Sequence, residues 1–442
     1  MTPDNINPST LLISSRKDPA GSLIHEELCN LIQQDTRAFP YIRHWYADER
    51  LIFLHGPAIP HTADRILFLS RHASERPRPV LTVHVTGNYG PADYGGDPGT
   101  LTPAAPDLMH ALINRLVVHA PEGYEVMYEA THHGPTSLPC PSCFVELGSS
   151  ETEWNDRNAA RAVAKAVLDA LVMDTSSVIP LAGFGGTHYA QRQTEITKLT
   201  RGGFGHIMPT RDIPYLTDDL FQDIIRSSGA VALYIDGKAM SGREERLITG
   251  LAERYQIPVL GQGDLMRMHT LPFADYIRIR TCAAAAVPGS SLVLHMLEHV
   301  QQPVVVSIPG ELIEEVMKCA AQPFLSALEP LPVAHLTGRG KACHPVFITD
   351  AAFSARIADE LIHLCVTLLQ DRYTCSFEGD FLIIKKLRFD PKKARELGIP
   401  PGPLYSELMA GNPVQAGDME IYPDMVMTET LTRIHIPQGQ AR

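Results

Sequence analysis

The sequence predicts an α/β protein, with a layered domain on a mostly parallel or mixed sheet and a smaller α+β domain after it. The first observation is that short apolar runs, typical of strands, alternate with segments of helical periodicity as far as about residue 260. The second is the stretch 283–289, Ala-Ala-Ala-Ala-Val-Pro-Gly, where this alternation stops. We therefore expect two domains, residues 1–275 and residues 276–442.

The elements of the first domain follow from apolar runs and helix-start signals. Asp18 and Pro19 are a preferred cap and first residue, and they predict a helix whose apolar positions continue to Ile32. Further helices are expected over 107–118, 156–171, 217–226 and 243–255. Glycine and proline between 91 and 106 predict a long loop. The expected strands are 11–13, 51–54, 66–69, 80–85, 125–128, 144–147, 179–182, 231–235 and 259–260.

The second domain has fewer and more scattered signals. A strand is expected over 304–308 and a helix over 311–319, with a proline-rich connector at 329–332. Residues 354–369 have the apolar spacing of an amphipathic helix. Two strand-like runs, 373–377 and 381–385, flank Glu378-Gly379-Asp380 and predict a hairpin.

Composition limits the class of protein. The formal net charge of −12 argues against a protein coated with cations for nucleic-acid binding. No apolar run approaches the ~20 residues that cross a membrane, and the start, Met1 to Asn5, lacks the basic and apolar regions of a signal peptide. We expect a cytoplasmic protein whose eight cysteines are mostly reduced. Cys140 and Cys143 have metal-site spacing, but the sequence has no second pair to complete a structural zinc site.

The most informative segment is Tyr128-Glu129-Ala130-Thr131-His132-His133-Gly134-Pro135-Thr136. It follows an expected strand, and Gly134-Pro135 ends regular structure, so a glutamate and two histidines lie in a turn at a strand end. Sites of open α/β sheets are built at such ends. Neighbouring strand residues point to opposite faces, so His132 and His133 can share a site only if the chain bends between them. The alternative is two surface histidines without a role.

Three other segments have the same form, an apolar strand that runs into a loop with polar residues and glycine. They are Val80 to Gly90, which includes His84 and Asn88; Phe144 to Trp154, which includes Glu146; and Ile179 to Tyr189, which includes Gly183-Phe184-Gly185-Gly186 and His188. With Gly205-His206 and the segment above, these motifs resemble the archaeal-type D-aminoacyl-tRNA deacylases, a family shared with plants. The resemblance covers roughly residues 8–270 and leaves an additional C-terminal region.

The resemblance implies a three-layer α/β/α domain with a mixed sheet, similar to peptidyl-tRNA hydrolases and purine nucleoside phosphorylases. It also implies hydrolysis of the ester that joins a D-amino acid to tRNA, with two zinc ions per chain. We assign catalytic roles to Thr131, His132, His133 and Glu146; substrate binding to Asn88, Gly185, Gly186, Tyr189 and Arg192; and metal binding to Glu129, His132, His133, His188 and His206. His84 ranks below these because we expect it to be buried inside the sheet.

Several alternatives remain open from the sequence. The Gly185-Gly186 loop offers N–H groups to an anion, or it is only a strand-to-helix turn. A basic patch for tRNA is expected near the fourth motif, or the same residues form a scattered solvated face: Arg192, Lys198, Arg201 and Arg211. The chain is expected to be a monomer acting on aminoacylated tRNA. The other possibilities are a metal-dependent amidase or esterase for a small molecule, and a tRNA-binding protein without catalysis.

Overall fold

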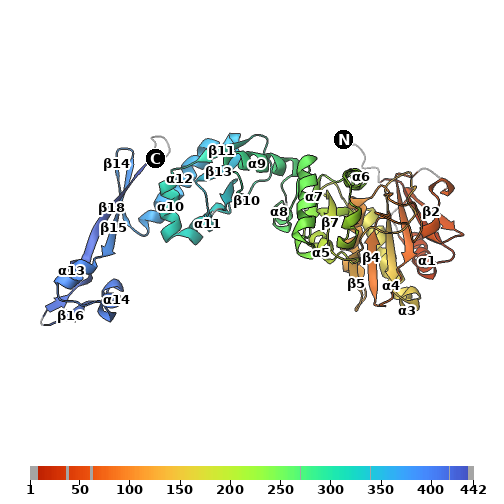
Figure 1. Cartoon of the computed structure of the whole chain (residues 1–442), viewed down its shortest axis with the longest axis horizontal. Coiled ribbons are helices and arrows are strands. Elements are labelled where there is room, and N and C mark those ends of the chain that lie inside the picture. The colour runs from red at the N-terminus through yellow and green to blue at the C-terminus, as the bar shows by residue number, and fades with distance from the viewer. Residues whose placement is uncertain are drawn as a thin grey trace. The chain divides into compact units, whose positions relative to one another are not determined.

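A computed structural model describes residues 8–35, 39–59, 63–268, 270–338, 340–417 and 419–436. The chain divides into two units, residues 1–269 and 270–442 (Figure 1), and each is described by itself below. The expectation about a signal peptide concerns Met1 to Asn5, which lie outside the described residues. Among the described helices, none combines the length and the apolar character needed to cross a bilayer.

A six-stranded mixed sheet forms the centre of the first unit, which confirms the predicted α/β class. Its strands are β1 (Thr10–Ser15), β2 (Ile42–Ala47), β3 (Arg65–Arg71), β4 (Val80–His84), β5 (Glu125–Tyr128) and β6 (Ser142–Gly148), in the order β2-β1-β3-β6-β4-β5. All neighbouring pairs are parallel except β4 and β6. In that antiparallel pair Thr82 lies opposite Glu146 and His84 lies opposite Phe144.

Three helices pack together on this sheet. They are α1 (Pro19–Gln34), α2 (Pro106–His119) and α4 (Arg157–Leu171), and α4 contacts both of the others. Helix α1 begins where predicted, because the Asp18 carboxylate accepts the Gly21 N–H at 2.9 Å. A short helix, α3 (Glu151–Trp154), follows β6.

The other face of β1 and β3 packs on irregular structure. Its apolar side chains pack with 3-10 turns at Leu51–Phe53 and Gly56–Ala58. The strand expected over 51–54 is therefore wrong. Leu51 and Leu54 are buried while Phe53 is 52% exposed. A three-residue repeat of burial fits a 3-10 turn and not the two-residue repeat of a strand.

A second, three-stranded parallel sheet completes the first unit. Its central strand β7 (Ile179–Phe184) lies between β8 (Gly202–Met208) and β9 (Ala232–Ile235). The strand expected at 259–260 is only a bridge from Val259 to Leu233. Helices of this part are α5 (Gln191–Leu199), α6 (Asp218–Ser228), α7 (Gly242–Arg254) and α8 (Gln262–Arg267).

Main-chain hydrogen bonds join the two sheets just beyond the end of β5. The Ala130 N–H donates to the His188 carbonyl at 2.8 Å, and the Thr131 N–H donates to the Ile207 carbonyl at 3.0 Å. These bonds bring the end of β5 beside the loop that follows β7. The loop expected between 91 and 106 contains no helix or strand before α2 begins.

The second unit is α+β. One antiparallel sheet has the order β10 (Ser291–Leu294), β12 (Ala334–Thr337), β13 (Val346–Asp350), β11 (Pro303–Ser307), and a second consists of β14 (Thr374–Glu378), β15 (Phe381–Phe389) and β18 (Met427–His435). A small hairpin joins β16 (Val414–Ala416) to β17 (Met419–Ile421). The helices are α9 (Phe273–Ala286), α10 (Gly310–Cys319), α11 (Ala321–Leu328), α12 (Ser354–Gln370), α13 (Pro391–Glu396) and α14 (Pro403–Met409).

The boundary between the two units follows residue 269, six residues before the boundary after residue 275 that the sequence predicted. The alanine run at 283–286 ends helix α9 instead of interrupting structure, because alanine is the strongest helix former. Helix α9 packs on β11, so residues 270–275 belong with the second unit.

Candidate active site

The ends of β3, β4, β5 and β6 deliver four ionisable side chains to one place. His72 follows β3, His84 ends β4, Glu129 follows β5 and Glu146 lies in β6. The His72 Nδ1 lies 3.1 Å from Glu129 Oε1 and 3.4 Å from Glu146 Oε2. The His84 Nε2 lies 3.7 Å from Glu146 Oε1. All four side chains are buried, so water does not screen their interactions.

A bend between His132 and His133 lets both face His84. His133 has a φ of +47°, a left-handed conformation that few residues other than glycine adopt. As a result the two adjacent rings lie 4.4 Å apart by their centroids, and they lie 4.5 and 4.9 Å from the ring of His84. The structure thus contains the bend that a shared site required.

Main-chain carbonyls fix which ring nitrogen of these three histidines carries hydrogen. The Nδ1 of His84, His132 and His133 lies 3.2, 2.8 and 2.6 Å from the carbonyls of Val85, Ala130 and Gly134. A carbonyl only accepts, so each Nδ1 carries hydrogen and donates. Burial lowers the pKa of His132 and His133, so these two rings are neutral and their Nε2 atoms keep the lone pair. This arrangement is typical of histidines that bind metal through Nε2. The three residues place one ring nitrogen each within 4.8 Å of the others.

A second group of donors lies beside the first and consists of His72, Glu129 and His188. His188 comes from the loop after β7, and its Nε2 lies 2.8 Å from Glu129 Oε2. The same oxygen lies 3.6 Å from His132 Nε2. Both carboxylate oxygens of Glu129 are buried, and among the described residues none gives them a hydrogen bond of ordinary geometry. Buried carboxylate oxygens that receive no such hydrogen bond and lie among imidazoles are suited to binding a cation.

Burial and mutual charge set the protonation of the group. Burial opposes ionisation of both carboxyl groups. The charge of His72 and the polar contacts of His188 and His72 nevertheless lower the pKa of Glu129 well below its usual range, and the polar contacts of His72 and His84 lower the pKa of Glu146 to about 2. Burial acts to lower the pKa of His72, but the two carboxylates raise it to about 12. Burial and the neighbouring His84 lower the pKa of His133 to about 4. The carboxylates are therefore ionised and His133 is neutral at pH 7.

The group opens into a cavity of about 1090 Å³. His72, His132, His133, Glu146, His188 and Tyr189 contribute to its lining, and the loops add Leu51, Ile52 and Tyr94. Six cationic residues also line it: Lys17, Arg50, Arg71, Arg76, Arg78 and Arg211. The cavity therefore joins a buried set of metal-type donors to a strongly basic rim, although the whole chain is acidic.

The structure brings together most of the residues that the sequence singled out. Glu129, His132, His133, Glu146, His188 and Tyr189 lie in or beside the two donor groups, with the Tyr189 hydroxyl 2.9 Å from His72 Nε2. His84, which ranked lowest, lies at the centre. It is buried as expected, but it faces the other histidines. His72 was missed, and the available signal was a histidine directly after an apolar strand run, Arg71-His72.

Thr131, His206 and Asn88 lie in supporting positions. His206 is buried, with Nδ1 3.1 Å from Thr131 Oγ1 and Nε2 2.8 Å from the Thr102 carbonyl, so both ring nitrogens are engaged and it joins neither donor group. Thr131 also accepts the Ile207 N–H at 3.2 Å. Asn88 donates to the carbonyl of Gly95 at 3.0 Å and thereby holds the long loop.

The Gly185-Gly186 loop does not present N–H groups to the cavity. The Gly185 N–H donates to the Met208 carbonyl at 2.9 Å, and the Gly186 N–H donates to Thr210 Oγ1 at 3.2 Å. Both glycines have positive φ, which fits the turn alternative. Arg192 does not line the cavity, and its side chain is hydrogen-bonded to Tyr234.

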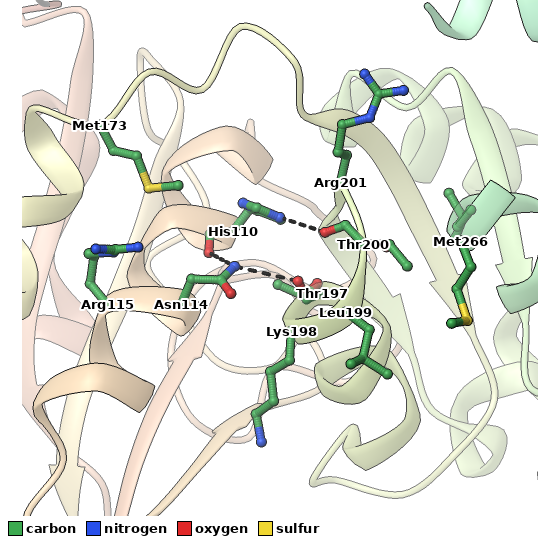
Figure 2. A pocket seen from close by; sticks show the side chains of 11 residues that line it. His110, Asn114, Arg115, Met173, Thr197, Lys198, Leu199, Thr200, Arg201 and Met266 are labelled. Carbon is green, nitrogen blue, oxygen red and sulfur yellow. Dashed lines mark hydrogen bonds between the residues drawn. The ribbon is translucent and has the colours of Figure 1, made fainter. Parts of the chain in front are cut away.

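The basic patch expected around the fourth motif does not form as a unit. Of its members only Arg211 lines the large cavity. Lys198 and Arg201 line a separate cavity of about 270 Å³ together with Arg115. In Figure 2 these three cationic side chains point in different directions, and the polar contacts shown join His110 to Thr200, and Asn114 to His110 and Thr197. The basic rim of the large cavity comes instead from residues near β1, β3 and the first 3-10 turn.

Comparison with known proteins shows which family this chain belongs to. Residues 59–260 match the family described as D-aminoacyl-tRNA deacylase. A D-aminoacyl-tRNA deacylase of Methanospirillum hungatei is 76% identical over 442 residues, which is 100% of both chains. The chain belongs to the D-aminoacyl-tRNA deacylase family. A second deacylase of this family, from Methanoregula boonei, is 41% identical over 96% of this chain and 98% of its own.

A solved structure is similar to a large part of this chain. It is the crystal structure of a conserved protein of unknown function, with 33% identity and a TM-score of 0.55. The similarity covers 59% of this chain and 97% of that chain. An α/β fold of this extent therefore occurs as a separate chain.

Proposed function

We propose that this chain hydrolyses the ester bond of D-aminoacyl-tRNA in the large cavity, releasing the D-amino acid and free tRNA. The observation that carries the proposal is the meeting of two His/Glu donor groups with a basic rim in one cavity. Membership of the deacylase family supports the substrate. The cationic side chains of the rim can bind the phosphates near the end of a tRNA. A chain of net charge −12 repels tRNA as a whole, so it needs such a local concentration of cations.

We further propose that the two donor groups hold zinc. His84, His132 and His133 would bind one ion, and His72, Glu129 and His188 a second, with Glu146 between them. The fit rests on the Nε2 lone pairs of His132 and His133, on the position of His84 beside them, and on the buried Glu129 oxygens. Zinc bound there supplies a Lewis acid that polarises the ester carbonyl and acidifies water.

The remaining residues of the cavity act on the substrate directly. Tyr189 lines the cavity with its hydroxyl 2.9 Å from His72 Nε2, and the Arg78 guanidinium carbon lies 4.1 Å from the Tyr189 ring centroid. In this proposal Arg78 and Arg211 receive phosphate oxygens, while Tyr189 orients the terminal ribose. The deep burial of Glu129 and Glu146 excludes bulk water from the donor groups and strengthens electrostatic interactions with the ester.

Selection against L-aminoacyl esters is assigned to main chain at the cavity wall. Enantiomers carry identical groups, so rejection requires a clash that moves the carbonyl out of line, and a displacement of about 1 Å can cost ~100-fold in rate. Gly134 is packed so tightly that an added Cβ would lie 2.4 Å from the Gly96 nitrogen and 2.5 Å from the Ile52 oxygen. This close packing makes the wall beside His133 rigid.

The test compares hydrolysis of D- and L-tyrosyl-tRNA by the full chain, after removal of metal with EDTA and again after zinc is restored. We expect hydrolysis of the D-ester alone, lost with EDTA and regained with zinc. Equal rates for both enantiomers would refute the assignment. Hydrolysis of small esters or amides without action on aminoacyl-tRNA would favour a small-molecule hydrolase, and tRNA binding without hydrolysis would indicate a binding protein.

A further inference from the structure

A third group of metal-type donors lies at the edge strand of the six-stranded sheet, on residues that the active site does not use. It consists of His25 and Cys29 on α1 and His44 on β2. His25 and Cys29 are four residues apart, so they share one face of the helix. His44 pairs with Leu12 of β1, and β2 has no neighbour on its outer side within the described sheet. The donors therefore connect a helix to an edge strand.

The donor atoms lie close enough to surround one ion. The His25 Nε2 lies 2.7 Å from the His44 Nδ1, and the Cys29 Sγ lies 3.9 Å from that same nitrogen. Tetrahedral zinc with ordinary bond lengths needs about 3.3 Å between two nitrogens and about 3.6 Å between nitrogen and sulfur. The two imidazoles must therefore separate by about 0.6 Å, and the sulfur is almost in place. His44 is exposed, so this small movement has room.

His25 is oriented as a ligand before any ion binds. Its side chain is fully buried, and its Nδ1 lies 2.6 Å from the hydroxyl of Ser14 on β1. When Nδ1–H donates to that hydroxyl, the lone pair of Nε2 points toward His44. The ring also stacks on Tyr46 at 4.1 Å between centroids, which prevents it from turning. A fixed ring with an outer hydrogen-bond partner is the usual condition of a metal-binding histidine.

We propose that His25, Cys29 and His44 form a further metal site, separate from the active site, that takes a zinc-class ion. Two imidazoles and a thiolate suit zinc and other soft or borderline transition metals and do not suit magnesium or calcium. Three protein ligands leave one position for water, because Cys29 is half-buried and His44 is exposed. The ion fastens the edge strand β2 to α1.

Sulfur makes this site distinguishable from the active site. Within the described part of the chain, the donor groups of the active site contain only imidazole and carboxylate. Cobalt(II) bound to a thiolate gives a near-ultraviolet charge-transfer absorption that nitrogen and oxygen ligands do not give. The full chain is therefore stripped of metal with a chelator and titrated with cobalt(II), and absorbance and bound cobalt are both measured.

The wild-type chain should develop the near-ultraviolet band. Cys29→Ser should lose it and bind one fewer cobalt ion per chain, while Ser14→Ala should keep the band with cobalt affinity about 10- to 100-fold weaker. Cys140→Ser is the matched control, since Cys140 is also half-buried in the first unit, and it should keep the band. Cys29→Ser should retain deacylation within about twofold of wild type.

Three results would overturn the proposal. They are cobalt binding by the wild-type chain without the near-ultraviolet band, a band that survives Cys29→Ser, and a band that disappears in Cys140→Ser. A loss of deacylation in Cys29→Ser would contradict the separation of this site from the active site. The three cobalt results do not depend on whether the chain hydrolyses D-aminoacyl-tRNA, so failure of the metal site and failure of the proposed activity are read from different measurements.

Discussion

At the scale of single residues, the carboxylate of Glu129 has the most contacts with the other donors of the active site. It lies within 3.6 Å of nitrogens from His72, His132 and His188. It is the member through which the two donor groups meet, because His132 belongs to one group and the other two histidines belong to the other.

Glu129→Gln should therefore remove deacylation while the fold survives. The amide keeps the shape of the side chain but loses the charge that balances the histidines. We expect a fall in kcat/KM of about 100- to 10,000-fold, the range for loss of a catalytic or ligating group, together with a loss of bound zinc. The control is Glu122→Gln, an exposed residue in the turn before the same strand. A Glu129→Gln enzyme within tenfold of wild type would contradict the role.

The cationic rim should act on substrate binding and not on the chemical step. Lys17 and Arg76 are exposed and line the cavity. Lys17→Ala and Arg76→Ala should each raise KM for D-tyrosyl-tRNA with little change in kcat, and each should reduce the slope of log KM against log salt by about one. Arg243→Ala, an exposed residue of α7, is the control and should change neither value. A fall in kcat at constant KM would place these residues in the chemistry.

The sequence predicted the donors that carry a local signal. Glu129, His132, His133, Glu146 and His188 lie in strand-end motifs. His72 lies in no such motif, and only the pairing of β3 with β6 brings it to the carboxylates. His206 was singled out through the Gly205-His206 motif of the family resemblance, but its ring nitrogens contact Thr131 and Thr102. Which histidines face one another depends on sheet order, and that order is not readable from one sequence.

At the scale of elements, one ion pair fixes a helix of the second unit to its sheet. Glu315 on α10 accepts from Lys318 at 2.9 Å and from Lys386 of β15. Lys386 is buried, with 7% of the residue exposed. Burial opposes ionisation of Glu315, but the two ammonium groups lower the pKa of this carboxyl. The folded state therefore binds its proton less tightly than the unfolded state does.

Glu315→Gln should destabilise the second unit at neutral pH. The change leaves the Lys386 ammonium buried without its partner, which costs about 1–3 kcal/mol. Because the folded pKa of Glu315 is depressed, its contribution is complete above the unfolded pKa of about 4.3 and is lost as pH falls through the folded value. The difference in unfolding free energy between wild type and Glu315→Gln should therefore become smaller at acid pH. Urea unfolding followed by circular dichroism at pH 7 and at acid pH measures this.

A neighbouring pair supplies the control. Glu314 faces Lys341 at 3.3 Å with both side chains about half exposed, so Glu314→Gln should change stability by less than about 0.5 kcal/mol. An equal effect of the two variants, or a gap for Glu315→Gln that is the same at both pH values, would contradict the assignment to the buried pair.

Elements with strong periodicity were predictable and short apolar runs were not. The helices at 156–171 and 354–369 and the first hairpin strand at 373–377 are present within one residue, while the second hairpin strand begins at Phe381 as predicted and continues four residues further, to Phe389. The four consecutive apolar residues Leu51-Ile52-Phe53-Leu54 are compatible with a strand and with a 3-10 turn. Packing of Leu51 and Leu54 on β1 and β3 decides between the two, and this information lies elsewhere in the chain.

At the scale of the whole molecule, all described donors of the active site lie in the unit of residues 1–269. We predict that this segment alone folds and hydrolyses D-tyrosyl-tRNA with kcat within about threefold of the full chain. A solved chain aligns over 97% of its own length with 59% of this one, a share close to that of this unit. Both tryptophans, Trp45 and Trp154, lie in this unit, so their fluorescence on urea unfolding reports its folding directly. A folded but inactive segment would show that the second unit completes the site.

The hydrogen bonds that join the two sheets of the first unit imply that bound metal determines how cooperatively the two sheets unfold. Glu129 extends from one sheet and His188 from the other, so both can bind the same ion only when the two sheets are docked. Its binding free energy then adds to the stability of the docked form by the usual mass-action relation. Chelation should loosen this junction before it affects the rest of the fold. Amide hydrogens of Ala130 and Thr131 would then exchange faster, while those of β1, buried between β2 and β3, would keep their rates.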